Sequence, residues 1–159
     1  MVDQRQSHFL PKEDIKTIQS ITGTFLYYTR ALDSIMLPAL NEIACTQAKP
    51  TQYTREECDQ IMDYAATYPQ VYVRFHASDM ILAVDSDAAY LVMPNAKSRI
   101  AGYFQLNDHP DHIQHPDING AILVECKALR NVMSSVAETE TAGVFHNAQR
   151  VIPIRYILE

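Results

Sequence analysis

The sequence predicts a mixed α/β protein in which helices come first, three antiparallel strands follow, and one more helix comes after them. Apolar residues recur every three or four positions between residues 12 and 69, as on one face of an amphipathic helix. From residue 70 they alternate with polar residues or form short apolar runs, which is typical of strands. The helical period returns at about residue 135. Short links between the strands favour antiparallel pairing.

The helical half contains three helices. A stripe of apolar residues predicts the first, from about residue 13 to 32, and a shorter one is predicted over residues 37–44. In the third, Thr54 and Glu57 have the spacing of a capping box, in which the hydroxyl accepts the Glu57 N–H and the carboxylate reaches back. Pro69 ends this helix. The first stripe comprises Ile15, Ile18, Ile21, Phe25, Leu26 and Leu32.

From residue 70 on, the pattern predicts strands and then a helix. The run at residues 80–84 predicts a buried central strand that ends where Asp85 and Asp87 follow. A turn is expected at residues 94–98 and a polar loop at 107–119. A helix is expected from about Ser135 to Arg150, followed by a last apolar stretch. Four stretches show a strand signal, residues 71–76, 80–84, 100–104 and 121–126, although the predicted sheet has three strands.

Composition excludes several classes of protein. No apolar run among the 159 residues approaches the ~20 residues of a membrane span, so no membrane partner is expected. With 4 glycines the chain has no glycine-rich phosphate loop. A net charge of −6 argues against nucleic-acid binding by bulk charge alone, but it is compatible with a nuclease built on carboxylates. Three scattered cysteines favour a reducing compartment, the cytoplasm or the nucleus.

Carboxylates near the predicted sheet are the sharpest chemical candidates. Asp87 follows an apolar strand and precedes two alanines, which suits a hard cation such as Mg²⁺. Glu138 and Glu140 lie near the start of the last helix and point to different sides of it, so only one can face the sheet. The alternative is structural, because aspartates often flank strands and the helix dipole favours glutamate in a first turn.

Two weaker patterns compete with these carboxylates. The loop at residues 108–117 contains Asp108, His109, Asp111, His112, His115 and Asp117, a set that could hold Zn²⁺ in a small zinc-binding protein. Its two prolines, and the lack of helical ligand spacing, favour a solvated hairpin loop instead. Four basic residues could contact phosphates or could be ordinary surface charge: Lys97, Arg99, Lys127 and Arg130.

Three stretches, taken in order, resemble the ribonuclease H region of copia-like LTR-retrotransposon polyproteins. They are residues 86–90 (SDAAY), 98–104 (SRIAGYF) and 134–140 (SSVAETE). Residues 23–28 (GTFLYY) and the helix at 54–68 look like the thumb and connection at the end of a reverse transcriptase. The resemblance extends from about residue 13 to the end of the sequence.

The resemblance implies a ribonuclease H-like α/β fold over residues 70–159, preceded by a reverse transcriptase-like helical segment over 1–69. Members of this family cut the RNA strand of an RNA–DNA hybrid with two Mg²⁺ ions, or Mn²⁺, held by acidic residues. Asp87 matches the catalytic first-strand aspartate and Glu140 the glutamate on the first helix; both are expected as metal ligands. Asp85, a weaker candidate, is a third possible ligand, and Glu138 is a neighbour of Glu140.

The sequence departs from the family after Glu140. The family has another essential aspartate on a fourth strand, but no Asp follows Glu140 here, and Glu159 is the one later acid. The fold is therefore expected to lack its last strands, and activity to be weak or absent. The expected partners are an RNA–DNA hybrid, the reverse transcriptase portion of the same polyprotein, and a second copy that pairs with the exposed strand edge. The alternative is a non-catalytic module that binds nucleic acid or itself.

Overall fold

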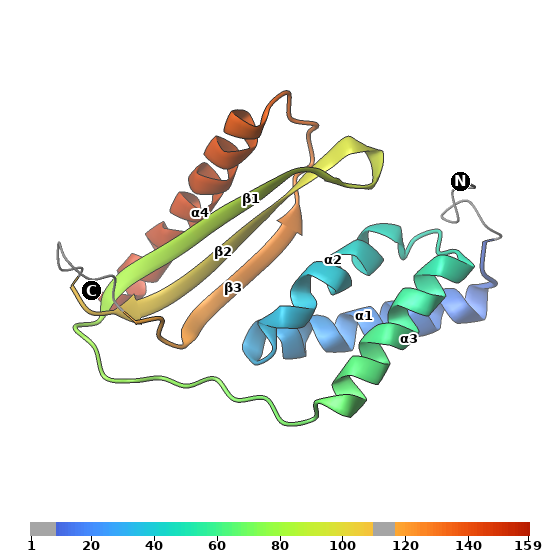
Figure 1. Ribbon diagram of the computed structural model, residues 1–159, viewed down its shortest axis with the longest axis horizontal. Helices are drawn as coiled ribbons and strands as arrows, with labels where there is room; N and C mark the ends of the chain where they lie inside the picture. Colours follow the sequence, from blue (N-terminus) through green and yellow to red (C-terminus); the bar gives the residue numbers. More distant parts are fainter. Residues whose placement is uncertain (1–8, 110–116) are drawn as a thin grey trace. The chain divides into compact units, whose positions relative to one another are not determined.

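The chain folds into two compact units, of which the first ends at Tyr72 and the second runs from Val73 to Glu159. The computed structural model describes residues 9–109 and 117–159 (Figure 1). The described residues form four α-helices and a three-stranded antiparallel sheet, so the mixed α/β class predicted from the sequence is confirmed. None of the described helices is both long and apolar enough to cross a membrane.

The first unit packs three helices around one apolar core. They are α1 (Lys12–Ala31), α2 (Leu37–Thr46) and α3 (Gln52–Thr67), and a 3-10 turn, η2 (Ser34–Met36), joins the first two. The predicted helices are all present. The core consists of Met36 of η2 and of apolar side chains on the inner faces of the three helices: Ile18, Leu40, Ile43, Cys58 and Ile61.

The start of α3 differs from the prediction. Thr51, rather than Thr54, is the N-cap, and the helix begins at Gln52. Thr54 is the third helical residue, and its hydroxyl accepts a hydrogen bond from the Thr51 N–H at 3.3 Å. The predicted capping box with Glu57 is therefore wrong, because an earlier hydroxyl residue with the same three-residue spacing caps the helix.

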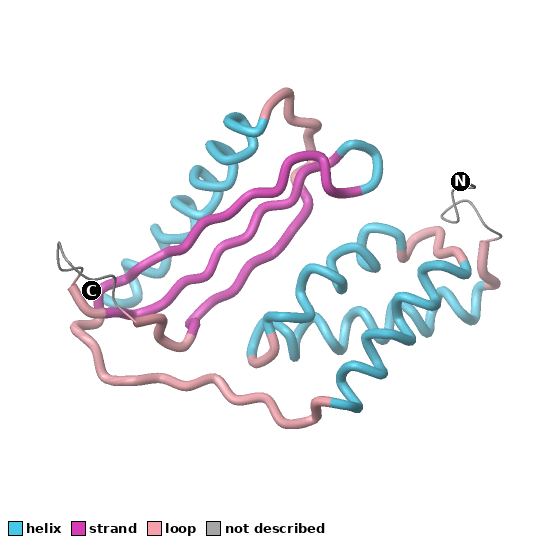
Figure 2. Tube along the Cα trace, viewed as in Figure 1, coloured by secondary structure: helices cyan, strands magenta, loops and turns pink. Residues whose placement is uncertain are grey.

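The second unit is a twisted sheet with a helix packed on one face (Figure 2). Its strands are β1 (Ile81–Met93), β2 (Lys97–Asn107) and β3 (Ala121–Ala128), in the order β1-β2-β3. A 3-10 turn, η3 (Pro94–Ala96), links the first two strands. The helix α4 (Val136–Leu158) packs mainly on β1 and less on β2.

Two strand predictions are wrong. Residues 71–76 form no strand; they belong to an extended segment in which the backbone N–H and C=O of His76 bond the side chain of Asn119, both at 3.0 Å. The run at residues 80–84 is not a central strand that stops at Asp85. It opens β1, which continues to Met93 and is an edge strand of the described sheet, while β2 lies in the centre.

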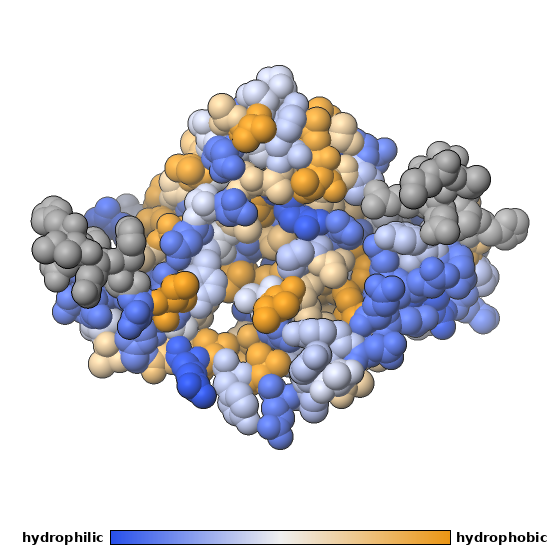
Figure 3. Space-filling model, in the orientation of Figure 1, coloured by the Kyte–Doolittle hydropathy of each residue, from blue (hydrophilic) through white to orange (hydrophobic). Residues whose placement is uncertain are grey.

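The helix α4 buries an unusual face. Thr139, Gly143 and Asn147, spaced four residues apart, are its buried positions, whereas Phe145 and Ile152 are exposed. The helix also continues eight residues beyond the predicted end at Arg150, through Pro153. Hydrophobic side chains also gather over the β1–β2 hairpin and the start of α4, at the top of Figure 3. The exposed ones include Leu91, Val92, Val132 and Val136.

Candidate metal and nucleic-acid site

The pleat of β1 separates its carboxylates from the helix. The Asn147 Nδ2 atom on α4 donates to Ser86 Oγ at 2.8 Å and to the Ala101 carbonyl at 2.9 Å, so Ser86 faces α4. The register between β1 and β2 is unbroken from Ile81 to Ala89. Since successive strand residues point to opposite faces, Asp85 and Asp87 project from the face that α4 does not cover.

Asp87 lies in the middle of β1 and is exposed, paired in register with Ala101 of β2. Its diagonal neighbour on the same face is Arg99, which pairs with Ala89. Asp85, two residues earlier, accepts a hydrogen bond from Gln105 Nε2 at 2.9 Å. That bond assigns Asp85 a structural role in the sheet, next to the buried amides of β2.

Glu140 lies early in α4, and the same stretch of helix contacts β1 beside Asp87. A Cβ atom added at Gly143, three residues later, would lie 3.5 Å from Ala88 Cβ and 3.7 Å from the Asp87 carbonyl oxygen. Glu140 itself is exposed, next to the fully buried Thr139. The two predicted ligands therefore belong to segments that meet, but their side chains start from opposite sides of the sheet.

Glu138 caps the helix. Its Oε2 accepts the Ser134 N–H at 2.6 Å and the hydroxyl of the same residue. In return, its N–H donates to Ser135 Oγ at 3.1 Å. The hydrogen bond from the Ser134 side chain, and after it the one from the Ser134 backbone N–H, lower the pKa of Glu138. This glutamate holds the first turn of α4 in place.

The structure contains a polar cluster that was not predicted from the sequence. Glu125 of β3 lies under α4, where its Oε2 is 3.1 Å from His146 Nε2 and its Oε1 is 3.1 Å from Arg150. Burial alone raises the pKa of Glu125, but the hydrogen bonds from His146 and Arg150, together with the positive charges of Arg150 and Lys127, lower it below its usual value. The three residues tie α4 to β3. The spacing of Glu125, His146 and Arg150 in sequence gave no sign of this contact.

The remaining predicted residues do not gather into one site. Lys97 and Arg99 share the face of the sheet with Asp87, while Lys127 lies in register with Ile100 on the α4 face. In the loop, Asp108 accepts the Asp79 N–H at 3.0 Å and the His109 N–H donates to Asp79 at 3.1 Å. Asp111, His112 and His115 lie outside the described residues.

Over residues 9–109 and 117–159, no three His, Cys, Asp or Glu side chains form a group that could hold a metal ion. A carboxylate pair is the most that Asp87 and Glu140 could offer, and the third candidate, Asp85, bonds Gln105. A two-metal centre needs several oxygen donors directed at one point. The donors described here do not fit that requirement.

No protein-family model, no curated protein and no solved structure matches the chain.

Proposed function

We propose that the second unit is a ribonuclease H-like module related to retroelement polyproteins. In the lineage it resembles, the reaction is Mg²⁺-dependent hydrolysis of the RNA strand of an RNA–DNA hybrid. The observation that carries the proposal is the element order: three antiparallel strands, then a helix that packs on the first two. Asp87 lies on the first strand and Glu140 early in the helix. The first unit is, by the same resemblance, a reverse transcriptase-like helical segment.

The geometry argues for weak or absent hydrolysis by this chain alone. The Asp87 side chain leaves the sheet on the face away from α4, and Glu140 is on α4, so one ion cannot be held by both without rearrangement. We therefore assign no catalytic step to the pair. By the resemblance Asp87 and Glu140 correspond to the metal ligands of the family, but in the described residues they do not form one site.

The test is cleavage of a labelled RNA–DNA hybrid with Mg²⁺ or Mn²⁺, alongside binding of the same hybrid measured by anisotropy. Asp87→Asn and Glu140→Gln are the informative variants, and Glu13→Gln, an exposed acid on α1, is the matched control for a lost charge. Cleavage that both informative variants abolish and the control keeps would support a metal site at this pair. Hybrid binding without cleavage would support a non-catalytic descendant. If the hybrid is neither bound nor cleaved, the nucleic-acid proposal is overturned.

Self-association is the second candidate, because the outer edge of β1 has no strand beside it in the described sheet. An edge strand of 13 residues presents a row of N–H and C=O groups to any strand that can pair with it. The flanking apolar side chains of Leu91 and Val92 are exposed. Sedimentation velocity of the wild type and of Ala88→Pro tests this. Proline removes an edge N–H, so a dimer lost in the variant supports edge pairing, and a monomeric wild type excludes it.

A further inference from the structure

Asp33 carries a buried carboxylate without a partner. It lies between α1 and η2, and the residue is 3% exposed. Its side chain does not cap η2, and among the described residues it makes no hydrogen bond or ion pair; the bonds at this position come from its backbone N–H and carbonyl. Buried charged groups are normally paired, because an unpaired one loses the hydration that it has in water. The fold of the first unit therefore leaves this charge uncompensated.

The carboxylate of Asp33 is shielded from solvent but not sealed off. Among the described residues, Asn41 Oδ1 and Asn147 Oδ1 are the side-chain polar atoms that are both fully enclosed and without a hydrogen bond. The Asp33 oxygens also lack a hydrogen bond but do not belong to that group, so part of the small exposed surface of the residue is theirs. A small group can therefore touch the carboxylate from solvent.

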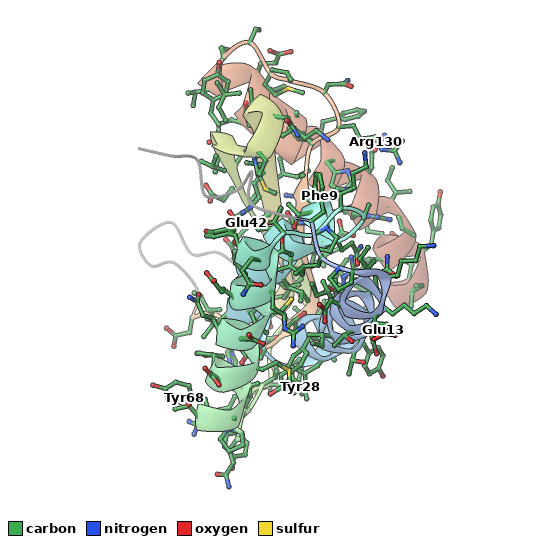
Figure 4. All side chains as sticks on the ribbon, turned by 90° about the vertical axis from the view of Figure 1, so that its right-hand side faces the viewer. Phe9, Glu13, Tyr28, Glu42, Tyr68 and Arg130 are labelled. Carbon is green, nitrogen blue, oxygen red and sulfur yellow. The ribbon has the colours of Figure 1, made fainter. Side chains whose placement is uncertain are left out.

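Three tyrosines lie near Asp33. The rings of Tyr64 and Tyr68 on the last turn of α3 are 5.0 Å apart, at an angle of 46°. The carbonyl of Tyr28 accepts the Asp33 N–H at 3.4 Å, and its side chain packs against the core. Burial raises the pKa of Tyr64 first, followed by the charge of Asp33 and then by Tyr68 and Tyr28, so the four side chains form one cluster. Figure 4 labels Tyr28 and Tyr68 in the lower part of the view.

The electrostatic potential at this cluster is negative. Helix α1 ends at Ala31 and helix α3 at Thr67, and the C-terminal end of a helix carries a partial negative charge. The last turn of α3 contains no basic residue, and Arg30 in the last turn of α1 is exposed. The face of a tyrosine ring is negative as well. The carboxylate, the helix ends and the rings therefore all favour a cation.

The chemistry of the cluster selects an organic cation. A hard metal ion takes several oxygen ligands, and over residues 9–109 and 117–159 no three His, Cys, Asp or Glu side chains are grouped to provide them. An ammonium N–H can donate a charge-assisted hydrogen bond to Asp33. Methyl groups on the nitrogen contact the ring faces and weaken hydration of the cation. A dimethylated ammonium group has both an N–H and methyl groups.

We propose that Asp33 and the three tyrosines bind a dimethylated ammonium group, with its N–H on the carboxylate and its methyl groups against the rings. A free amine and a dimethylated lysine side chain carry the same head group. The four residues belong to the first unit, so this site is independent of the ribonuclease H-like proposal for the second.

The probe is N,N-dimethylbutylammonium chloride, titrated into the isotope-labelled full chain and followed by the NMR signals of the backbone amides. Two cations serve as comparisons: butylammonium, which lacks the methyl groups, and trimethylbutylammonium, which lacks the N–H. We expect the signals of Asp33 and Tyr64 to shift saturably, and each comparison cation to bind at least about threefold more weakly. The absence of a saturable shift with the dimethylated probe, or equal binding of all three cations, overturns the proposal.

Two charge variants separate the site from bulk attraction. Asp33→Asn removes the charge and keeps the shape, and Asp63→Asn removes the same charge from an exposed neighbour of Tyr64 that does not act on its hydroxyl. We expect at least about tenfold weaker binding for Asp33→Asn and less than about a twofold change for Asp63→Asn. Since Asp33→Asn removes an unpaired buried charge, its melting temperature should not fall. Equal effects of the two variants on binding would contradict the assignment.

Two exposed tyrosines test the contribution of the rings. Tyr68 is 58% exposed and Tyr27, which is outside the cluster, is 81% exposed, so the fold should not depend on either side chain. Tyr68→Leu should weaken binding at least about threefold and Tyr27→Leu less than about twofold. Unchanged binding by Tyr68→Leu would refute the role of the rings.

A competition experiment identifies the source of the cation. A glycine–serine peptide with a single dimethyl-lysine is added to the chain loaded with the dimethylated amine. Displacement of the amine at an equal or lower concentration of peptide supports the site as a reader of modified lysine. A peptide that binds at least about tenfold more weakly than the amine supports it as a site for a free amine.

Discussion

Asn119 fixes the extended segment before β1 to the end of the sheet. It is 4% exposed, and its side chain makes four hydrogen bonds. The Oδ1 atom accepts the N–H groups of His76 and Gly120, at 3.0 and 2.8 Å. Its Nδ2 atom donates to the carbonyls of His76 and Leu106, at 3.0 and 2.6 Å. Replacing Asn119 with alanine removes all four hydrogen bonds, so the backbone groups that made them have to bond to water instead.

The expected loss of stability follows from those bonds. Each is worth roughly 0.5–1.5 kcal/mol net, and the two to His76 are discounted because His76 is exposed. We therefore expect Asn119→Ala to lower the free energy of unfolding of the second unit by about 2–4 kcal/mol. Asn131→Ala, at an exposed asparagine in the loop before α4, should change it by less than about 0.5 kcal/mol.

Amide hydrogen exchange combined with urea unfolding separates the local effect from the global one. In the wild type the His76 amide should be protected, since it donates to Asn119. In Asn119→Ala it should exchange at the rate of an open chain, and the strand amides should show the lower stability. If the His76 amide stays protected, or if the urea midpoint does not move, the reasoning from these four bonds is refuted.

Three further predictions concern packing, pH and thiol chemistry. Gly143→Ala should stabilise α4 by up to about 1 kcal/mol, because the added Cβ would make ordinary van der Waals contacts. Gly102→Ala should destabilise the sheet, since the added Cβ would lie 2.9 Å from the Phe104 ring. Thermal unfolding of the two variants tests both expectations. Because the pKa of Glu125 is lowered in the folded state, the stability that this group contributes should be present above pH 4.5, the ordinary pKa of a glutamate, and should be lost as the pH falls below that value. Glu125→Gln should flatten this part of a curve of stability against pH. Burial raises the pKa of Cys58 to about 11, so a thiol reagent at pH 8 should modify the exposed Cys45 first and reach Cys58 only on unfolding.

Periodicity was enough to predict that the four helices exist and that an antiparallel sheet lies between the third and the fourth, because it depends on neighbours a few residues apart. The start of α3 could not be predicted in the same way. Thr51 and Thr54 are both capping residues with a suitable third residue after them, and tertiary packing, which buries both, decides between them. The strand signal at residues 71–76 was misleading for a related reason, since its backbone partner is a side chain 43 residues away.

The candidate site depends on the length of β1, which the sequence does not reveal. If the strand had ended at Asp85, as predicted, Asp87 would have been free to turn toward the helix. Because β1 continues to Met93, the pleat fixes Asp87 on the far face from α4. The Glu125 cluster was equally hidden, as its partners are 21 and 25 residues distant in sequence.

The buried face of α4 has a consequence for how this protein is compared with others. Its contact with the sheet rests on a threonine, a glycine and an asparagine, while valine, phenylalanine and isoleucine face outward. A sequence profile that treats apolar positions as the buried ones would assign the exposed face of α4 to the core and would align the wrong residues. Homologues should instead share small or hydrogen-bonding residues at the positions of Thr139, Gly143 and Asn147, while the outward apolar positions drift.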